Sequence, residues 1–414
     1  MSFAKKAINV HPRALKVAIV HDWLVAWAGA EKVLEQMLDI WPQADIYCMV
    51  DTLSSTGEVA VLKGKNITPS FIQGLPFAKK HYRLWLPLMP LAVEQFDLSG
   101  YDLVVSSSHA VAKGVITGPD TYHLCYCYSP MRYAWDLQHE YLRGATSLLS
   151  KLKQWPMRYL LHRLRLWDVA SSLRPDKIVA ISNYIARRID KCYRRKADVV
   201  YPPVDTERLT PYYIPTEQKK SYYIAASRLV PYKRIQLIAE AFAQMPDKSL
   251  IIIGDGPERP ALERYLATLP STQTNVSYLG YQEDDDLYRY LSEARAMIFA
   301  AEEDFGILPV EAQAVGTPVI AFGRGGATET VVSNKTGLFF NEASRAGIID
   351  AVAMFEAKTW DSQQCVHNAE KFSNAVFKAQ LKQHILFDGH PLQQDAMAAT
   401  TKTVPVDWQV TSLK

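Results

Sequence analysis

The sequence lacks the cysteine patterns that would indicate a metal site or a disulfide framework. Its 5 cysteines are scattered and form neither a Cys-x-x-Cys pair nor the spacing of a zinc site. An odd, scattered set of this kind is typical of reduced thiols. We therefore expect Cys125 and Cys127, which lie close together in an apolar run, to be core residues on one face of a strand rather than metal ligands.

Long apolar runs are also missing. No stretch reaches the ~18 apolar residues that a membrane-spanning helix needs. The amino-terminal stretch MSFAKKAINVHPRALKVAIV has neither the apolar segment nor the small-residue cleavage site of a secretory signal. We expect a cytoplasmic protein.

An excess of charge of one sign is absent as well. Lys and Arg number 46 against 43 Asp and Glu, for a net charge of +3, which is too balanced for a bulk polyanion binder but compatible with local basic patches. The basic residues form no motif of a nucleic-acid-binding module, so we expect no nucleic-acid partner. With 414 residues, 48% of them apolar and 21% charged, the chain has ordinary soluble composition and room for two or three domains, which excludes disorder and fibres.

The first half of the chain shows apolar runs of the buried parallel-strand type, separated by loops and helical patterns. The first run is followed by a glycine-containing turn and the amphipathic stretch AEKVLEQMLDIW, which together predict a strand-loop-helix unit. This rhythm predicts a wound parallel sheet. The expected strands are Leu15–His21, Ala44–Val50, Tyr101–Ser106, His123–Tyr128, Lys177–Ile181 and Asp198–Val200.

A proline-containing stretch, YPPVD at 201–205, followed by polar residues through Lys220, predicts a linker, after which a second series of the same kind begins. We expect a Rossmann-like acceptor domain over 1–205, a Rossmann-like nucleotide-sugar domain over 206–370, a final helix at 371–388 that packs back on the first domain, and a flexible tail at 389–414. Ligands of such sheets bind at the carboxyl ends of the strands, so the default site is a cleft between two facing sheets. The expected strands of the second domain are Tyr222–Ser227, Ser249–Gly254, Val276–Gly280, Ala296–Ala301, Pro318–Gly323 and Gly337–Phe340.

The stretch EEDFGILPVEAQAVG at 302–316 predicts a short helix whose start faces this cleft. Pro309 suits the first turn, Glu311 falls near a third-position capping carboxylate, and Gly316 can end the helix. Free amides at the helix start, with Gly306 allowing close approach, indicate a phosphate site. Glu303 could bind sugar hydroxyls and Glu311 a ribose diol, although a capping residue and a solvated loop charge would also explain the pair.

Two further stretches add to this site. In SRLVPYKR, Arg228 and Lys233 stand where a strand ends and a helix begins, so both cations could neutralise a diphosphate and the charge that develops on it as it leaves. A solvated basic turn is the alternative. In VHDWLVAWAGAEKVL, Gly29 precedes a helix and its amide could touch the phosphate from the other domain.

Taken together, these features resemble the retaining glycosyltransferases of the GT-B fold, specifically family 4, with its Glu-x7-Glu motif, glycine-containing first loop and Arg and Lys pair. The resemblance covers nearly the whole chain and implies two facing Rossmann-like domains with parallel sheets. Within the family, the sequence is similar to the bacterial O-antigen mannosyltransferase branch. The stretches that carry this likeness are HDWLV, GAEKVLE, SSSHAVAKGV, CYCYSPMRYAWD, YPPVD, SRLVPYKR, IIGDGPE and EEDFGILPVEAQAVGTPVIAFGRGGATETV.

The resemblance implies a role for each matching residue. It implies that Glu303 binds the donor sugar, that Glu311 binds the ribose, and that Arg228 and Lys233 bind the diphosphate. The backbone contacts to the donor fall on Gly29, Phe305, Gly306, Ile307 and Leu308.

The sequence also departs from the family pattern. Ala28 and Ala30 flank Gly29 where a Gly-Gly pair is frequent, and Tyr128 stands where the branch often has a histidine near the donor sugar. A phenol does not titrate near neutrality, so His109 is the remaining candidate for catalytic histidine chemistry, or else a structural histidine.

The implied reaction is a retaining transfer in which the acceptor hydroxyl attacks on the side of the leaving group and the departing phosphate takes the proton. It needs no cofactor and no metal. The acidic run Glu283–Asp286 precedes a predicted helix, and we expect it to supply an N-cap and dipole charge rather than a metal site.

Two basic, aromatic segments in the first half indicate the acceptor. LPFAKKHYRLWLPLMPL and SLLSKLKQWPMRYLLHRLRLWDVASSLR mix apolar residues with cations that include Lys151, Lys153, Arg158, Arg163 and Arg165. They would suit an anionic bilayer surface, although a core helix with a solvated basic face is the alternative. We therefore expect a lipid-linked glycan acceptor and peripheral binding at the inner face of the plasma membrane.

Three functional hypotheses follow. The first is transfer of mannose from GDP-mannose to a polyprenyl-diphosphate-linked oligosaccharide. The second is the same fold with a UDP-sugar donor. The third is a non-catalytic, membrane-docked subunit that binds a nucleotide-sugar.

Overall fold

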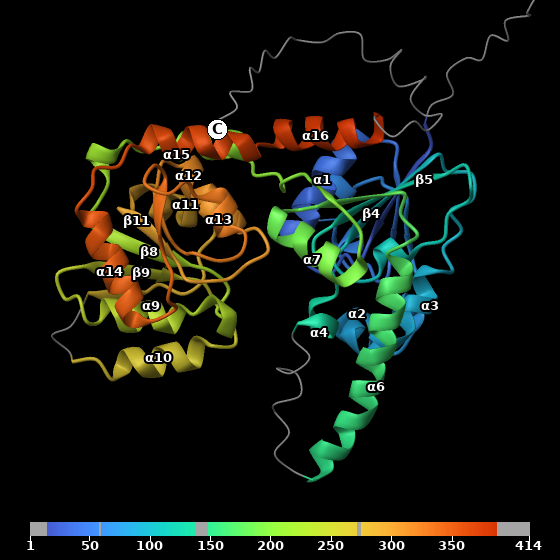
Figure 1. Cartoon of the computed structure of the whole chain (residues 1–414), viewed down its shortest axis with the longest axis horizontal. Helices are drawn as coiled ribbons and strands as arrows, with labels where there is room; N and C mark the ends of the chain where they lie inside the picture. The colour runs from blue at the N-terminus through green and yellow to red at the C-terminus, as the bar shows by residue number, and fades with distance from the viewer. Residues whose placement is uncertain (1–14, 58, 137–147, 271–274, 387–414) are drawn as a thin grey trace, which may run out of the picture.

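The computed structural model describes residues 15–57, 59–136, 148–270 and 275–386, with only the backbone for 148–154 and 386. Residues 1–14 of the first expected domain, residues 387–388 of the expected final helix and the flexible tail predicted at 389–414 lie outside the described residues. The described chain forms two α/β halves (Figure 1).

The N-terminal half is built on a seven-stranded parallel sheet of order β3-β2-β1-β4-β5-β6-β7. Continuous apolar runs such as VAIVH form its central strands because both faces of the sheet are covered. Its strands are β1 (Val17–His21), β2 (Asp45–Cys48), β3 (Ile67–Pro69), β4 (Leu103–Ser108), β5 (Tyr122–Cys127), β6 (Lys177–Ala180) and β7 (Asp198–Val199). Its helices are α1 (Gly29–Ile40), α2 (Ala78–His81), α3 (Met89–Val93), α4 (Arg132–Trp135), α6 (Leu148–Ser171) and α7 (Asn183–Tyr193).

The C-terminal half repeats this plan with a six-stranded parallel sheet of order β10-β9-β8-β11-β12-β13. Its strands are β8 (Tyr222–Ala226), β9 (Ser249–Ile253), β10 (Val276–Tyr278), β11 (Ala296–Phe299), β12 (Val319–Phe322) and β13 (Gly337–Phe340). Its helices are α8 (Thr206–Leu209), α9 (Ile235–Phe242), α10 (Arg259–Ala267), α11 (Asp284–Glu293), α12 (Ile307–Ala314), α13 (Ala327–Thr330), α14 (Arg345–Glu356) and α15 (Ser362–Ala369).

In both sheets the strand order reverses in the middle, between β1 and β4 in one and between β8 and β11 in the other. Ligands of open parallel sheets bind at such switch points, outside the carboxyl ends of the strands. The predicted fold class, two parallel-sheet Rossmann-like domains, is confirmed.

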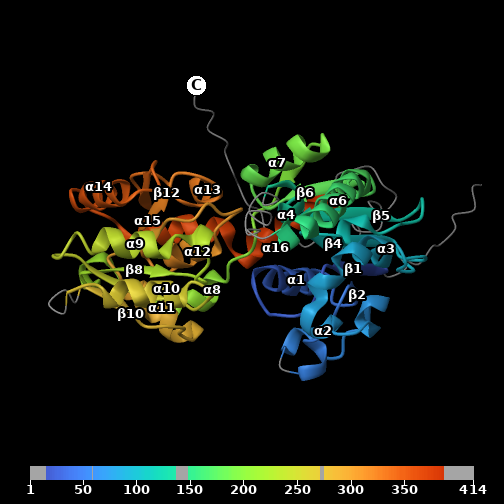
Figure 2. The ribbon, with the colours of Figure 1, turned by 90° about the horizontal axis from the view of Figure 1, so that it is seen from below.

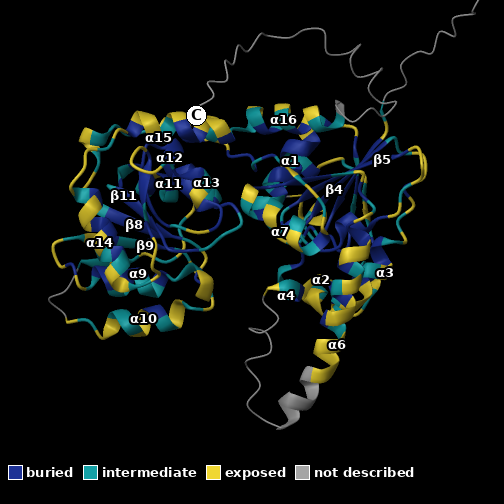
Figure 3. Ribbon diagram, viewed as in Figure 1, coloured by how far each residue is buried: buried dark blue, intermediate teal, exposed yellow. Residues whose placement is uncertain are grey.

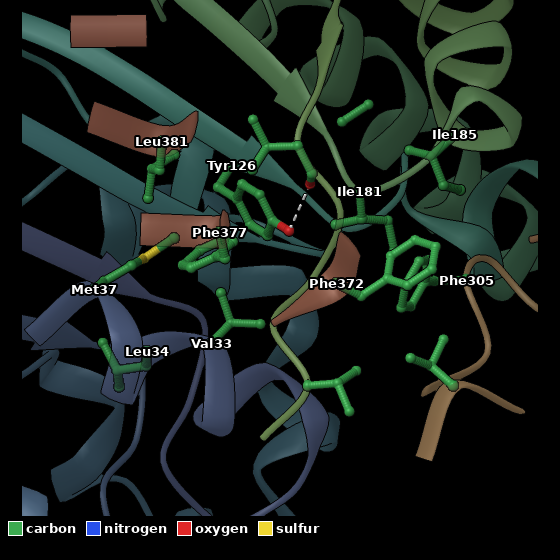
Figure 4. Close-up of a cluster of buried hydrophobic side chains, with 14 of the residues drawn as sticks. Val33, Leu34, Met37, Tyr126, Ile181, Ile185, Phe305, Phe372, Phe377 and Leu381 are labelled. Atoms are coloured by element: carbon green, nitrogen blue, oxygen red, sulfur yellow. Dashed lines mark hydrogen bonds between the residues drawn. The ribbon is translucent and has the colours of Figure 1, made fainter. Parts of the chain in front are cut away.

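The last described helix, α16 (Asn374–Leu386), crosses from the C-terminal half and lies against α1 (Figures 1 and 2). Its Phe377 is buried against Tyr126 of β5, with ring centroids 5.6 Å apart. Figure 4 shows Phe377 and Leu381 among side chains of α1 and β5, with Phe305 of the C-terminal half nearby. One hydrophobic cluster therefore continues from the first sheet through α16 into the second half.

Cys125 and Cys127 are both buried, unoxidised residues of β5, as their place in an apolar run predicts. Within the described residues, no helix is long and apolar enough to cross a bilayer.

Candidate active site between the two sheets

A cleft of about 760 Å³ lies between the two halves, at the two switch points. Its volume is in the range of small-molecule sites. Its walls come from the start of α1 and the loops after β4 and β5 on one side, and from the loops after β8 and β11 on the other. The lining residues are Trp27, Ala28, Gly29, Ala30, Lys32, Val33, His109, Tyr128, Arg132, Ile181, Pro202, Ala226, Ser227, Tyr232, Lys233, Asp284, Phe299, Glu303, Asp304, Phe305, Gly306, Ile307, Leu308 and Glu311.

The loop after β11, residues 302–306 and here called the Glu303 loop, leads into α12 at the floor of the cleft. Gly306 is the N-cap of α12 and has a φ of 87°, a left-handed conformation that a residue with a side chain adopts at a cost. The turn places the first amides of α12, which have no partner inside the helix, along the cleft. The predicted backbone contacts at 305–308 thus share one wall.

Glu311 also lines the cleft, but the prediction that it caps the helix start is wrong. It is the fifth residue of α12, because the helix begins at Ile307, so it lies two residues beyond the third, capping position. It is buried beside Tyr288 (O–O distance 3.4 Å) and Lys32 (Oε1 to Nζ 3.6 Å), and burial raises the pKa of the Glu311 carboxyl. Gly316, with a φ of 82°, follows the end of α12 as predicted.

Lys233, in the loop after β8, forms an ion pair with Glu303, in the loop after β11, so the two side chains meet on the same wall of the cleft. Burial, and after it the Arg132 guanidinium, lowers the pKa of Lys233 to about 8, so the ammonium is still the main form at neutral pH. The two predicted donor-binding side chains thus meet each other directly.

Arg228 is exposed on the same loop, next to the lining residue Ser227. Its predicted contact with a diphosphate stays a prediction. The loop itself is held by the turn after β9: a Cβ on Gly254 would lie 1.8 Å from the carbonyl oxygen of Ser227, and one on Gly256 2.4 Å from that of Leu229. These two glycines therefore support the basic loop by close backbone packing.

On the opposite wall, the start of α1 meets the start of α12. A Cβ on Gly29 would lie 3.0 Å from Cδ1 of Ile307, so the small residue permits this approach of the two halves. The amide of Ala28 donates to Glu31 within the first turn of α1, at 3.0 Å. Gly29 lines the cleft, as expected for a backbone contact.

Tyr128 lines the cleft and is fixed by hydrogen bonds. Its hydroxyl lies 2.9 Å from Oγ of Ser107 and donates to the carbonyl of Ala30 at 3.2 Å. Burial raises the pKa of Tyr128 well above its ordinary value, so the phenol stays protonated. Tyr128 can donate and accept hydrogen bonds but cannot act as a base near neutral pH.

His109 also lines the cleft, with its Nδ1 3.1 Å from the carboxylate of Asp22. Burial lowers the pKa of His109 in spite of this carboxylate, which favours the neutral imidazole. His109 is therefore held in orientation by Asp22 while its ring edge faces Trp23, at a centroid distance of 4.5 Å.

Sequence reasoning missed a cluster of charged side chains that joins the two halves beside the cleft. Asp304 of the Glu303 loop reaches across to Nη1 of Arg132 (3.4 Å) and Nη1 of Arg188 (3.3 Å) in the N-terminal half. Burial raises the pKa of Asp304, and the two guanidinium groups oppose that shift. Arg132 lies in the quoted stretch CYCYSPMRYAWD, but no local pattern marks it as a cleft residue, because its partner is 172 positions away.

The acidic run at the start of α11 was expected to supply both an N-cap and charge for the helix dipole, and only the second role is found. Asp284 to Asp286 lie in the first turn of the helix, which suits its dipole, but the Glu283 side chain makes no cap hydrogen bond. Asp284 instead pairs with Arg208 of α8 at 3.1 Å. Across the described residues, no group of three or more His, Cys, Asp or Glu side chains is arranged to hold a metal ion.

Two family models match the chain, one in each half. The Glycosyltransferase Family 4 model matches residues 27–208 and the model named Glycosyl transferases group 1 matches residues 214–372. The cleft lies between the two matched segments, and its lining residues come from both.

Among curated relatives, the chain is 32% identical over 202 residues to the GDP-mannose-dependent alpha-(1-6)-phosphatidylinositol monomannoside mannosyltransferase of Mycobacterium tuberculosis, which covers 43% of this chain and 52% of that relative. It is 34% identical over 190 residues to the monoacylated-substrate counterpart of Corynebacterium glutamicum, covering 39% and 48%. The chain thus spans about half the length of the curated relatives it matches.

Solved structures share the fold over nearly the whole chain. Anabaena HepE, solved in complex with UDP and glucose, has a TM-score of 0.60 and 16% identity, and covers 90% of this chain and 99% of its own. The lipopolysaccharide outer core galactosyltransferase WaaB has a TM-score of 0.62 and 15% identity with the same coverage. These neighbours have the GT-B architecture, in agreement with the two facing sheets described above.

Proposed function

We propose, from the premise that this chain is a GT-B glycosyltransferase assembled from a family 4 domain and a group 1 domain, that it transfers mannose from GDP-mannose to a polyprenyl-diphosphate-linked oligosaccharide with retention of configuration. The setting is bacterial surface polysaccharide assembly. The observation that carries the proposal is the cleft itself, where Lys233, Glu303, Glu311 and the start of α12 line one cavity.

In this proposal each cleft residue has a task. The diphosphate of the donor lies against Lys233 and the amides at the start of α12, where fixed positive charge meets the anion. Glu303, released from Lys233 by the incoming diphosphate, accepts hydrogen bonds from the mannose hydroxyls. Glu311 accepts those of the ribose.

The chemical step uses the same charges. The acceptor hydroxyl attacks C1 of mannose on the face of the leaving group, the bond between C1 and the diphosphate oxygen breaks, and the departing phosphate takes the hydroxyl proton. Lys233 and the helix amides stabilise the charge that builds on the diphosphate. Tyr128 and His109 line the facing wall, where they can orient hydroxyl groups. No cofactor or metal enters this step.

The choice of mannose rests on the relatives, two of which are named as GDP-mannose-dependent mannosyltransferases. A UDP-sugar donor is the alternative within the same reaction. Another relative supports a sugar other than mannose: the N-acetyl-alpha-D-glucosaminyl L-malate synthase of Bacillus anthracis is 28% identical over 189 residues. A non-catalytic, membrane-docked subunit that binds the nucleotide-sugar is the alternative outside catalysis.

The lipid-linked acceptor and membrane binding rest on one end of the N-terminal half. Figure 3 shows many exposed residues along α2 and α6 at this end. Phe77 and Leu84 are 76% and 71% exposed, Trp155 is 74% exposed, and exposed cations lie beside them. The combination suits an anionic lipid surface at the inner face of the plasma membrane.

The basic set expected to face the lipid needs one correction. Arg165 is partly buried and donates to the carbonyl of Ala134 at 2.8 Å, so it holds α4 rather than facing outward. The side chains of Lys151 and Lys153 lie outside the described ones. The membrane-facing surface proposed here, called the basic-apolar face, consists of Phe77, Lys79, Lys80, Arg83, Leu84, Trp155, Arg158 and Arg163.

The test is transfer of labelled mannose from GDP-mannose to a polyprenyl-diphosphate saccharide by the purified protein. The wild-type chain is expected to form product, and Glu303→Ala to lower kcat by at least about 10²-fold because it removes a group that orients the sugar. Membrane binding of Glu303→Ala is expected to equal that of the wild type, because Glu303 lies in the cleft and not on the basic-apolar face. Equal transfer by both proteins would exclude the assigned role of Glu303, and no transfer by the wild type from any nucleotide-sugar would favour the non-catalytic subunit.

A further inference from the structure

Glu329, in α13 of the C-terminal half, holds the start of α7 in the N-terminal half. Its carboxylate accepts hydrogen bonds from the backbone amides of Asn183 (2.8 Å) and Tyr184 (2.7 Å) and from Nδ2 of Asn183 (2.8 Å). The hydroxyl of Tyr201 donates to it as well, at 3.1 Å. α13 and α7 lie side by side in Figures 1 and 2.

The contact matches what a helix start requires. The first amides of a helix have no partner within it and carry partial positive charge, so a carboxylate placed there makes charge-assisted bonds. The side chain of Ser182, the N-cap of α7, accepts a hydrogen bond from the amide of Ile185. Glu329 supplies the acceptors for the amides of Asn183 and Tyr184, across the boundary between the halves.

The helix that carries Glu329, α13, is itself bonded to the Glu303 loop. The amide of Gly326, immediately before α13, donates to the carbonyl of Glu303 at 2.7 Å. A Cβ on Gly326 would lie 2.3 Å from Cα of Phe305, so α13 and the loop are packed backbone against backbone. Ser182 adds a second link, because its hydroxyl donates to the carbonyl of Asp304 at 2.6 Å.

We propose that Glu329 is a positioning residue: it fixes the Glu303 loop against the acceptor-side half, so that the sugar-binding carboxylate and the N-terminal wall of the cleft keep one relative geometry during transfer. This inference rests on the proposed function, because that function supplies the sugar transfer in which the geometry matters. Glu329 is not among the residues that line the cleft, so it acts through the loop.

Four variants separate this role from direct donor binding. Glu329→Ala removes the acceptor, and Glu329→Gln keeps an acceptor oxygen without the charge. Asn183→Pro removes a single backbone N–H at the first helical position, where proline is tolerated, and the extended Ser182 (φ −165°, ψ 162°) suits the residue before a proline. Asn183→Ala is its matched control, since it loses Nδ2 but keeps the amide.

Kinetics give the expected pattern. Glu329→Ala lowers kcat on the order of 10²-fold, as a misplaced reacting group does, and changes the donor Kd by less than about threefold. Glu329→Gln falls between the wild type and Glu329→Ala, and Asn183→Pro loses about tenfold more kcat than Asn183→Ala. An unchanged kcat in Glu329→Ala, an equal change in kcat and donor Kd, or equal kcat in the two Asn183 variants would overturn the proposal.

Amide hydrogen exchange tests the contact without any activity. The amides of Asn183 and Tyr184 are expected to be protected in the wild type and to exchange at least about tenfold faster in Glu329→Ala, while strand β6 is unaffected. If the wild type transfers no sugar, the proposed function fails while this measurement still decides the contact. Equal exchange at these two amides in both proteins would overturn the positioning role.

Discussion

At the scale of single residues, Asp22 holds the wall of the cleft that carries His109. Its buried carboxylate accepts from the backbone amides of His109, Ala110, Val111 and Ala112, at 2.6 to 2.9 Å. Charge-assisted bonds of this number compensate for burying a carboxylate. Asp22 lies in the quoted stretch HDWLV, yet no local pattern marks it as a structural residue, because its partners are about 90 positions away.

Asp22→Asn is expected to lower the free energy of unfolding by about 3 kcal/mol at pH 7, since an amide cannot accept all these bonds. Burial alone would raise the pKa of Asp22, but His109 and the backbone amides outweigh it, so its pKa is lowered. Stability from a lowered carboxyl pKa is fully present above the unfolded value of about 3.9 and is lost as the pH falls through the folded value.

Urea unfolding from pH 7 down to pH 2 checks this prediction, with the exposed Asp120→Asn as matched control. The deficit of Asp22→Asn should shrink as the pH falls below about 4, and the control should stay within about 0.5 kcal/mol of the wild type. A deficit that is absent at pH 7, or that does not depend on pH, would contradict the account.

At the scale of elements, apolar runs predicted twelve of the thirteen strands found in the described residues, with ends shifted by a few residues at most. β3 was missed because Ile67–Pro69 is a three-residue edge strand that ends in proline and has no apolar run to mark it. The starts of α1, α7 and α12 all lie at the boundary between the halves, and only two of them had a local signal, namely Gly29 and Gly306. The start of α7 is recognised only through Glu329, which the fold brings there from far along the chain.

The basic-apolar face gives a prediction at the same scale. Reversing Lys79, Lys80 and Arg83 to Glu is expected to lower binding to anionic vesicles by at least about tenfold, since each cation near the surface contributes about 1 kcal/mol. The wild-type interaction should weaken with salt, because exposed charges are screened. Vesicle flotation at two salt concentrations measures both effects.

The matched control places the same charge change on the C-terminal half. Arg264, Lys335 and Lys371 are exposed there, and reversing them to Glu should leave vesicle binding nearly unchanged. Flotation that ignores lipid charge, or an equal loss in both triple variants, would exclude the proposed face.

At the scale of the whole molecule, the two sheets and their facing switch points followed from the repeated strand-helix rhythm. The contacts across the cleft did not, because they join residues more than 100 positions apart, such as the Asp304 carboxylate to Arg188 and the Asp304 carbonyl to Ser182. The Glu303 loop and the Lys233 turn were found because each follows a strand and carries its own sequence motif. Their ion pair depends on packing and could not be read from either motif.

The central claim is that this cleft binds a mannose donor through Lys233. Calorimetric titration tests it most directly, with GDP-mannose and UDP-glucose added to the wild type and to Lys233→Ala. The account predicts saturable binding of GDP-mannose at one site, at least about tenfold tighter than UDP-glucose, and a further weakening of about tenfold or more in Lys233→Ala. Binding of GDP-mannose that is absent in the wild type, or equal in the wild type and Lys233→Ala, would contradict it.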